Sequence, residues 1–250
     1  MSDYNLSDLM SRNYIGVFTD GSSYIDKKKE YYEASSAVII VINNIEVCRL
    51  GCFHVNGTNS IGEIYAMMLA IDKVEELKRD NPELRDYFTF YVSDSKYVVS
   101  SLTEWIFNWV KINENNKIWK SSSNQPISYQ WIMKYLYNNY ISDKAWRDKN
   151  LILHINGHVN NKSIGAAYKK ALKRNSQKTW SYKKCITLNT FKELVSYNHI
   201  VDAIAEKIRS EKITYYEEGD ENTQWVRRKR ILPVRNQRFV IKSRTNESRI

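Results

Sequence analysis

Cysteine is scarce in this sequence, and its spacing excludes two kinds of site. The 250 residues include three cysteines, Cys48, Cys52 and Cys185, and no two of them form a Cys-x-x-Cys pair. A disulfide framework and a zinc ribbon both need paired cysteines, so neither is expected. His54 lies close to Cys48 and Cys52, but alternation along a strand explains that grouping. We expect reduced thiols without a chemical role.

Long apolar runs are missing too. No window approaches the roughly 18 uninterrupted apolar residues of a membrane-spanning helix, and the first ten residues carry acids without a long apolar stretch. We therefore expect no membrane contact and a cytoplasmic location. With 42% hydrophobic residues, 18 Tyr and 7 Trp, the chain has enough apolar surface for a substantial core. Its length suits one domain with insertions, or one domain plus an appendage.

The net charge of +10 is unevenly distributed. Residues 159–197 contain nine Lys or Arg against one acid, and residues 225–250 contain the same numbers. Each segment is therefore +8, and the rest of the chain is −6. Clustered basic charge favours phosphate backbones, so both segments are predicted to contact nucleic acid. A solvated surface or a disordered tail stays open as the alternative.

Hydrophobic patterning predicts an α/β fold. Apolar, β-branched runs indicate strands at 13–20, 34–43, 45–54, 87–94 and 150–157, and Asn43-Asn44 suits a hairpin turn. Helices are predicted at about 61–79, 95–102, 103–110, 127–140, 166–174 and 199–213. This order predicts a five-stranded mixed sheet, with three antiparallel strands plus two parallel ones, flanked by helices. Residues 1–214 form the predicted domain, and 215–250 a charged C-terminal extension.

Three acids are expected at one end of this sheet. Asp20 and Asp94 end predicted strands, where an α/β sheet opens a crevice for ligands, and Glu63 lies in the first turn of a predicted helix. Converging carboxylates suit hard divalent cations, which prefer oxygen ligands. Each acid alone would be an ordinary surface carboxylate or a helix cap.

Four sequence blocks occur in the order typical of type 1 ribonucleases H. They are Thr19-Asp20-Gly21-Ser22, Thr58-Asn59-x-x-x-Glu63, Ser93-Asp94-Ser95-x-Tyr97-Val98, and Gly157-His158 with Asn198-x-x-x-Asp202-x-x-Ala205. The chain resembles this family from about residue 13 to residue 213. The resemblance implies a ribonuclease H-like fold and an endonuclease that hydrolyses the RNA strand of RNA–DNA hybrids. Its products would carry 5′-phosphate and 3′-hydroxyl ends.

The resemblance also implies roles for particular residues. Asp20, Glu63, Asp94 and Asp202 would be catalytic and would bind two Mg²⁺ ions, for which Mn²⁺ could substitute. Glu63 would also reach the 2′-hydroxyl of the substrate. His158 would assist proton transfer or product release. The assignment of Asp202 depends on aligning the last helix with the family across a long insertion.

Substrate contacts are implied for three groups of residues. Thr58 is expected near a DNA phosphate and Asn59 near RNA 2′-hydroxyls, although helix capping would explain both. Trp105, Trp109 and Lys111 resemble the aromatic and basic handle that grips DNA in bacterial members, although the tryptophans could be core residues. The remaining expected contacts are Gly21, Ser22, Lys169, Lys170, Lys173 and Arg174.

The sequence departs from the family most clearly before its last helix. About forty residues separate His158 from Asn198, where the family usually has a short loop. Basic and aromatic residues alternate there, so we hypothesise that residues 159–197 supplement or replace the handle, and that deleting 162–192 weakens hybrid binding but leaves a folded protein. Two other functions stay open: a structure-selective DNA nuclease of this fold, and a catalytically inactive hybrid-binding protein. A monomer is expected.

Overall fold

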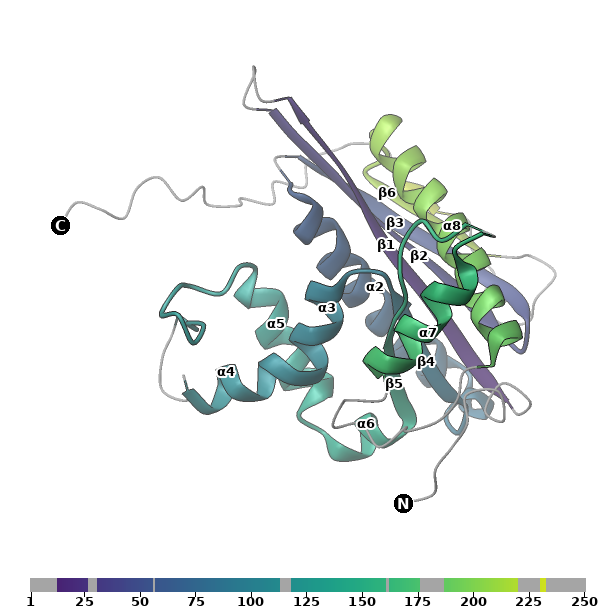
Figure 1. Ribbon diagram of the computed structural model, residues 1–250, viewed down its shortest axis with the longest axis horizontal. Helices are drawn as coiled ribbons and strands as arrows, with labels where there is room; N and C mark the ends of the chain where they lie inside the picture. Colours follow the sequence, from purple (N-terminus) through teal and green to yellow (C-terminus); the bar gives the residue numbers. More distant parts are fainter. Residues whose placement is uncertain are drawn as a thin grey trace.

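The computed structural model describes residues 13–26, 31–55, 57–112, 118–160, 162–175, 187–219 and 230–232. Five strands form most of its sheet (Figure 1), in the order β5-β4-β1-β2-β3: β1 (Tyr14–Asp26), β2 (Tyr31–Ile42), β3 (Ile45–Val55), β4 (Phe88–Ser93) and β5 (Asn150–His154). β1 and β2 are antiparallel, as are β2 and β3, whereas β4 is parallel to both β1 and β5. The predicted five-stranded mixed sheet is confirmed.

The turn between β2 and β3 shows why this register forms. Asn43 and Asn44 both have positive φ, 50° and 68°, and asparagine adopts this left-handed backbone more readily than most residues. The Asn43 Oδ1 accepts a hydrogen bond from the Tyr14 backbone N–H at 3.0 Å, and the Tyr14 hydroxyl donates to Asn44 Oδ1 at 2.6 Å. The hairpin turn is thereby tied to the start of β1.

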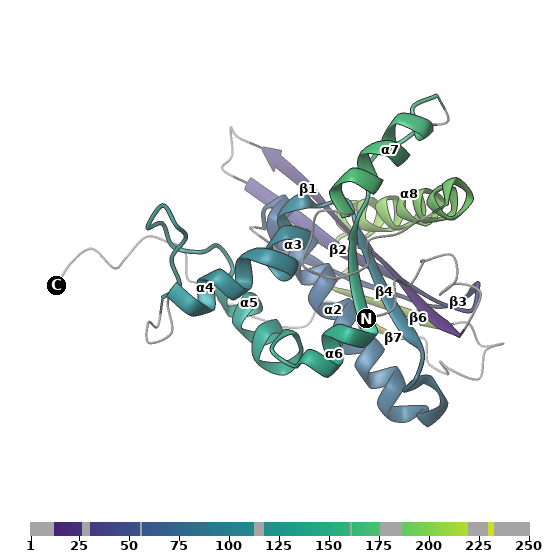
Figure 2. The same ribbon diagram turned by 60° about the horizontal axis from the view of Figure 1, so that its bottom comes forward.

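Helices cover both faces of the sheet (Figure 2). One face carries α2 (Asn59–Asp80), η1 (Pro82–Leu84), α3 (Lys96–Ser100), η2 (Ser101–Trp105), α4 (Ile106–Ile112), α5 (Gln130–Leu136), η3 (Tyr137–Ile141) and α6 (Lys144–Lys149). The other carries α7 (Ile164–Asn175) and α8 (Leu188–Ser210). Alternation along β1 serves both cores, because Ile15 and Val17 pack on the α2 side and Tyr14 and Phe18 on the α8 side. None of the helices in the described ranges is long and apolar enough to cross a membrane.

The sheet extends beyond the five predicted strands. β6 (Tyr215–Gly219) pairs antiparallel with β3, and β7 (Arg230–Leu232) pairs with β6. The sequence predicted no strand here, because the short acidic β6 is held between β3 and β7 by backbone hydrogen bonds, which need no apolar pattern. The C-terminal extension therefore contributes strands to the sheet, while residues 220–229 and 233–250 lie outside the described ranges.

The last helix begins earlier than predicted. α8 begins at Leu188 and not near residue 199, because the Thr187 hydroxyl accepts a hydrogen bond from the Thr190 backbone N–H at 3.2 Å. Phe191 and Leu194 are fully buried against the sheet. Residues 188–197 therefore belong to α8, and a deletion of 162–192 would remove this cap and a core residue. We therefore expect this deletion to destabilise the fold, in contrast to the prediction from the sequence.

His54 is partly buried on β3, where its ring contacts polar groups of β2 and β3. Its Nε2 is 2.7 Å from the Ser36 hydroxyl and 3.6 Å from the Cys52 sulfur. Cys48 and Cys52 are free and buried, whereas Cys185 lies outside the described residues. Burial raises the pKa of the Cys52 thiol to about 12 and lowers the pKa of His54 from 6.5 to about 4. Neither group is charged at neutral pH.

His54 predicts an acid-sensitive contribution to stability. The folded protein keeps His54 neutral, whereas the unfolded chain protonates it below pH 6.5, so this stability is present at pH 7 and is lost as the pH falls toward 4. Between pH 7 and pH 4.5 the wild type is expected to lose about 2.5 kcal/mol more than His54→Gln in urea unfolding. A His199→Gln variant, changed at an exposed histidine, should behave as the wild type. Equal losses in wild type and His54→Gln would contradict the assignment.

Candidate active site

Four carboxylates reach one region of the molecule from four segments of the chain. The sequence predicted that the first strand ends at Asp20. In the structure, β1 continues to Asp26 and stays paired with β2. Its parallel partner β4 ends at Ser93, opposite Thr19, so Asp20 is the first β1 residue beyond the parallel pairing. Asp94 directly follows β4. Asp20 and Asp94 therefore both lie where the parallel pairing of β1 with β4 ends.

The other two acids come from helices on opposite faces of the sheet. Glu63 is the fifth residue of α2 and so lies beyond the predicted first turn, because the helix begins at Asn59. Asp202 lies in the middle of α8. Glycine brings α2 against β1, since a Cβ on Gly21 would lie 2.5 Å from the Glu63 backbone nitrogen. Two backbones can approach this closely only without that side chain.

The acids influence one another electrostatically. Asp20 is 6% exposed, and burial together with the negative charges of Asp94, Asp202 and Glu63 raises its pKa to about 9. The Gly21 N–H donates to Asp20 Oδ1 at 2.7 Å and opposes this shift. Burial also raises the pKa of Glu63 and of Asp94. Such a group of buried acids stabilises positive charge brought among them.

Neutral hydrogen-bond donors orient the carboxylates. Ser95 donates from its hydroxyl to Glu63 Oε2 at 2.5 Å, and Asn59 donates from Nδ2 to Glu63 Oε1 at 2.7 Å. Asn198 lies one helical turn before Asp202 and directs its Nδ2 to Asp94 Oδ2 at 3.5 Å. Ser95 and Asn198 belong to the sequence blocks shared with type 1 ribonucleases H, but no role was predicted for them. Their adjacency to Asp94 and Asp202 was the available signal.

His158 lies at the exposed side of this acidic cluster. Its Nδ1 is 3.8 Å from Asp202 Oδ2, and its backbone has a positive φ of 51°. The neighbouring Gly157 lies against Asp94, because a Cβ there would be 2.2 Å from Asp94 Oδ2. The loop after β5 therefore packs on one acid and presents a histidine beside another.

The family assignment follows from the sequence once this geometry is known. The profile of the RNase H family matches residues 12–210. A ribonuclease H of Treponema denticola is 31% identical over 155 residues, which are 59% of this chain and 88% of the relative. The chain belongs to the RNase H family. Ribonuclease HI of Haemophilus influenzae is 39% identical over 77 residues, covering 30% of this chain and 41% of that protein.

Solved structures with a similar fold include LC11-RNase H1, isolated from compost, with a TM-score of 0.37 and 15% identity over 65% of this chain and 98% of that one. LC9-RNase H1 has a TM-score of 0.40 and is 12% identical, over 76% of this chain and 84% of that one. The protease–reverse transcriptase of prototype foamy virus has a TM-score of 0.44 and is 18% identical, over 71% of this chain and 22% of that one.

In this RNase H family member, some of the residues expected to contact substrate are already bonded to other parts of the protein. The Thr58 hydroxyl lies 2.6 Å from the Tyr129 hydroxyl, a partner that the sequence did not indicate. Ser22 is engaged with α8, because its hydroxyl donates to Glu206 Oε2 at 2.8 Å and accepts from Arg209 Nε at 3.1 Å. Ser22 therefore connects β1 to α8.

The two tryptophans of the expected handle differ in exposure. Trp105 is 37% exposed, whereas Trp109 is 7% exposed and packs in the core between the sheet and the helices on the α2 side. Their ring centroids are 6.0 Å apart, and Lys111 is exposed near the end of α4. Trp105 is therefore the member of the pair that can offer a ring surface to a ligand.

The basic helix predicted within the insertion is present as α7. Lys169, Lys170 and Lys173 are exposed, while Ala167 and Ala171 are buried against the α8-side core. α7 is thus amphipathic, with its lysines directed to solvent. The side chain of Arg174 lies outside the described residues.

The donor set fits a hard divalent cation by its chemistry. Asp20, Glu63, Asp94 and Asp202 offer carboxylate oxygens, and the raised pKa values of the first three reflect burial and crowded negative charge. Within the described ranges, however, no three His, Cys, Asp or Glu side chains are grouped so that they could hold a metal ion as they stand. Hydrogen bonds to neutral neighbours occupy the carboxylates, and a cation would replace some of these bonds.

Proposed function

We propose that this chain is an endonuclease that hydrolyses the RNA strand of RNA–DNA hybrids and leaves 5′-phosphate and 3′-hydroxyl ends. One observation carries the proposal: Asp20, Glu63, Asp94 and Asp202 converge from β1, α2, the end of β4 and α8, and burial and mutual repulsion raise the pKa of Asp20 to about 9. Crowded like charges, one of them buried, are unfavourable for a fold unless they bind something positive. Membership of the RNase H family supports the substrate class.

Two divalent cations, Mg²⁺ or Mn²⁺, would be held by these four carboxylates. When bound, they would supply an activated water and stabilise the leaving oxygen. The protein's own residues keep the carboxylates oriented, with Ser95 and Asn59 on Glu63 and Asn198 on Asp94. His158, exposed beside Asp202, can exchange a proton between the site and solvent.

A four-substrate assay tests the proposal against its alternatives. The wild type and Asp94→Asn are incubated with Mg²⁺ and end-labelled RNA–DNA hybrid, duplex DNA, duplex RNA and branched DNA. We expect cleavage of the RNA strand of the hybrid only, and loss of that cleavage in Asp94→Asn with hybrid binding retained. Cleavage of branched DNA would instead support a structure-selective DNA nuclease. Hybrid binding without cleavage by the wild type would support an inactive binding protein.

We propose that α7 contributes to substrate binding through its exposed lysines. Replacing Lys169 and Lys170 by Gln removes two charges without disturbing the buried Ala167 and Ala171. The KM for hybrid is expected to rise about tenfold near physiological salt, and the slope of log affinity against log salt to fall by about 2. The kcat should stay within about twofold of the wild type.

A matched variant controls for net charge alone. Lys144 and Lys207 are exposed on α6 and α8, and replacing both by Gln removes the same charge. This control should leave KM and the salt slope near wild-type values. Equal effects in the two variants would assign the change to overall charge and reject α7 as a substrate contact.

We also propose that the enzyme works as a monomer and that its basic C-terminal segment, 225–250, adds nucleic-acid affinity. Sedimentation of the full chain with and without hybrid tests the first statement. A truncation after Leu232 keeps β7 and removes five of the nine Lys and Arg residues of this segment, so it tests the contribution of residues 233–250. A dimer in the absence of substrate, or unchanged hybrid affinity in the truncated chain, would contradict the respective statement.

A further inference from the structure

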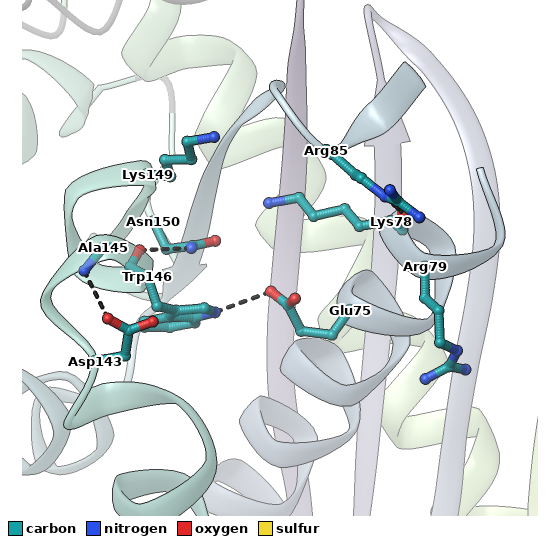
Figure 3. A pocket seen from close by; sticks show the side chains of 9 residues that line it. All are labelled: Glu75, Lys78, Arg79, Arg85, Asp143, Ala145, Trp146, Lys149 and Asn150. Atoms are coloured by element: carbon teal, nitrogen blue, oxygen red, sulfur yellow. Dashed lines mark hydrogen bonds between the residues drawn. The ribbon is translucent and has the colours of Figure 1, made fainter. Parts of the chain in front are cut away.

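A pocket lies at the end of the sheet opposite the four acids of the candidate site. The acids follow the carboxyl end of β4, whereas this pocket contains Asn150, the first residue of the parallel strand β5. Its volume is about 450 Å³, and its walls come from the end of α2, the segment after η1, and α6 (Figure 3). A hollow of this size accommodates a small molecule.

The pocket carries more positive than negative side chains. Lys78, Arg79, Arg85 and Lys149 line it, against Glu75 and Asp143. Both acids are engaged in the protein, since Glu75 Oε1 accepts a hydrogen bond from Trp146 Nε1 at 2.9 Å and Asp143 Oδ1 caps α6 through the Ala145 N–H at 2.8 Å. Two of the cations are also engaged, Lys149 with Asp86 at 3.0 Å and Arg79 with Asp80 at 3.3 Å. Lys78 and Arg85 are the two lining cations that form no ion pair within the described residues, and the lining has four cations against two acids.

Lys78 is the unusual member of this set. It is 7% exposed, and within the described residues its ammonium has no hydrogen-bond acceptor or ion-pair partner. Basic residues in the last turn of a helix complement the helix dipole, but that role does not require burial. Burial lowers the pKa of Lys78, the negative charge of Glu75 opposes this shift, and the charge of Lys149 adds to it. The Lys78 side chain is thus held in the wall of the pocket, and its ammonium is the part that a ligand there would meet.

Asn150 supplies a complementary unsatisfied group. It is 2% exposed, and its Nδ2 donates to the Trp146 carbonyl at 2.7 Å, whereas its Oδ1 is buried without a partner. Lys78 and Asn150 point toward each other across the pocket in Figure 3. A molecule between them must therefore accept hydrogen bonds from an ammonium and donate one to an amide oxygen.

We propose that this pocket binds a phosphate group with a free end, either inorganic phosphate or a phosphate monoester. Its charged oxygens accept from Lys78, with Lys149 and Arg85 adding positive charge. The second pKa of a phosphate monoester is about 6, so the form with one P–O–H is the minor one at neutral pH. Asn150 Oδ1 can only accept a hydrogen bond and therefore favours this form. Sulfate and phosphodiesters have no such proton near neutral pH. The depth of Lys78 also excludes a diester, which continues as a chain on both sides of the phosphorus.

Binding is measured on the full chain by calorimetry and by the indole N–H signal of Trp146, which is identified by its absence in Trp146→Phe. The ligands are inorganic phosphate, methyl phosphate, sulfate and dimethyl phosphate. We expect the first two to shift the Trp146 signal and the last two to bind at least about tenfold more weakly. Inorganic phosphate binding more tightly than methyl phosphate would identify the free ion as the ligand, and the reverse would identify the ester.

Variants then assign the binding to this pocket. Lys78→Met keeps the length of the side chain and should weaken phosphate binding at least about tenfold, whereas Lys207→Met, on the distant α8, should not change it. Should Lys78→Met fail to fold, Lys149→Gln at an exposed position gives the same test, with an expected weakening of about threefold. The proposal is overturned if sulfate binds as tightly as phosphate, if phosphate leaves the Trp146 signal unchanged, or if a folded pocket variant binds as the wild type does.

Discussion

Asp20→Asn is expected to lower the rate of hybrid cleavage by about a thousandfold or more. Asp20 is the most buried of the four acids, and its carboxylate is under the influence of the other three. Asparagine keeps the size of the side chain and the oxygen that accepts the Gly21 N–H, but it cannot carry a negative charge. The loss would therefore come from missing charge and not from a rearranged site.

Two measurements separate this explanation from a general loss of structure. Single-turnover cleavage gives the rate, and thermal unfolding with and without Mg²⁺ gives stability. Ligand binding to the folded state raises the unfolding temperature, so Mg²⁺ should stabilise the wild type more than Asp20→Asn. Asp148→Asn, at a position 54% exposed in α6, should change the rate less than about twofold. An Asp20→Asn protein that cleaves within tenfold of the wild type, or that gains as much stability from Mg²⁺, would contradict the proposed role.

The sequence predicted the centre of the fold because that part is specified by apolar patterning. β1 to β5 were each indicated by β-branched and aromatic runs, and α2 by its apolar stripe. Gly21, Ser22 and Ser23 suggested a turn, but β1 continues through them because each pairs with a residue of β2, as Ser22 does with Ser35. Tertiary pairing prevails over the local preference of glycine and serine.

Features that depend on distant partners could not be predicted from local patterns. β6 is acidic and short, and its position depends on the free edge of β3. The start of α8 depends on the Thr187 cap, which follows a polar basic stretch and resembles many other threonines in sequence. Lys78 is one of many basic residues on paper. Only the approach of α6 and β5 encloses its side chain and places it opposite the Asn150 amide.

The same distinction applies to the candidate site. The four acids could be chosen from the sequence because they lie in recognisable blocks, but the residues that orient them could not be ranked. Asn198 contacts Asp94 across 104 positions of sequence, and Ser95 contacts Glu63 across 32. Trp105 and Trp109 look alike at helical spacing, and their burial separates them.

Gly157→Ala is expected to lower kcat about a hundredfold while leaving the free energy of unfolding within about 1 kcal/mol of the wild type. A Cβ at this position would lie 2.2 Å from Asp94 Oδ2 and 3.1 Å from its Cγ, so the carboxylate has to move. Gly157 does not have a positive φ, so its backbone accepts alanine without strain. A displacement of about 1 Å of a catalytic group costs roughly this factor in rate.

Gly165→Ala provides the matched control. Gly165 lies in the first turn of α7 and a Cβ there would meet nothing within 4 Å, so alanine should leave kcat unchanged and stabilise the helix by up to about 1 kcal/mol. Urea unfolding and single-turnover cleavage of both variants give the comparison. Full activity in Gly157→Ala would show that the position of Asp94 is not critical. Reduced activity in Gly157→Ala, which keeps all four acids, would show that the position of the Asp94 carboxylate matters. Asp20→Asn and Asp94→Asn test only the charge of the carboxylates.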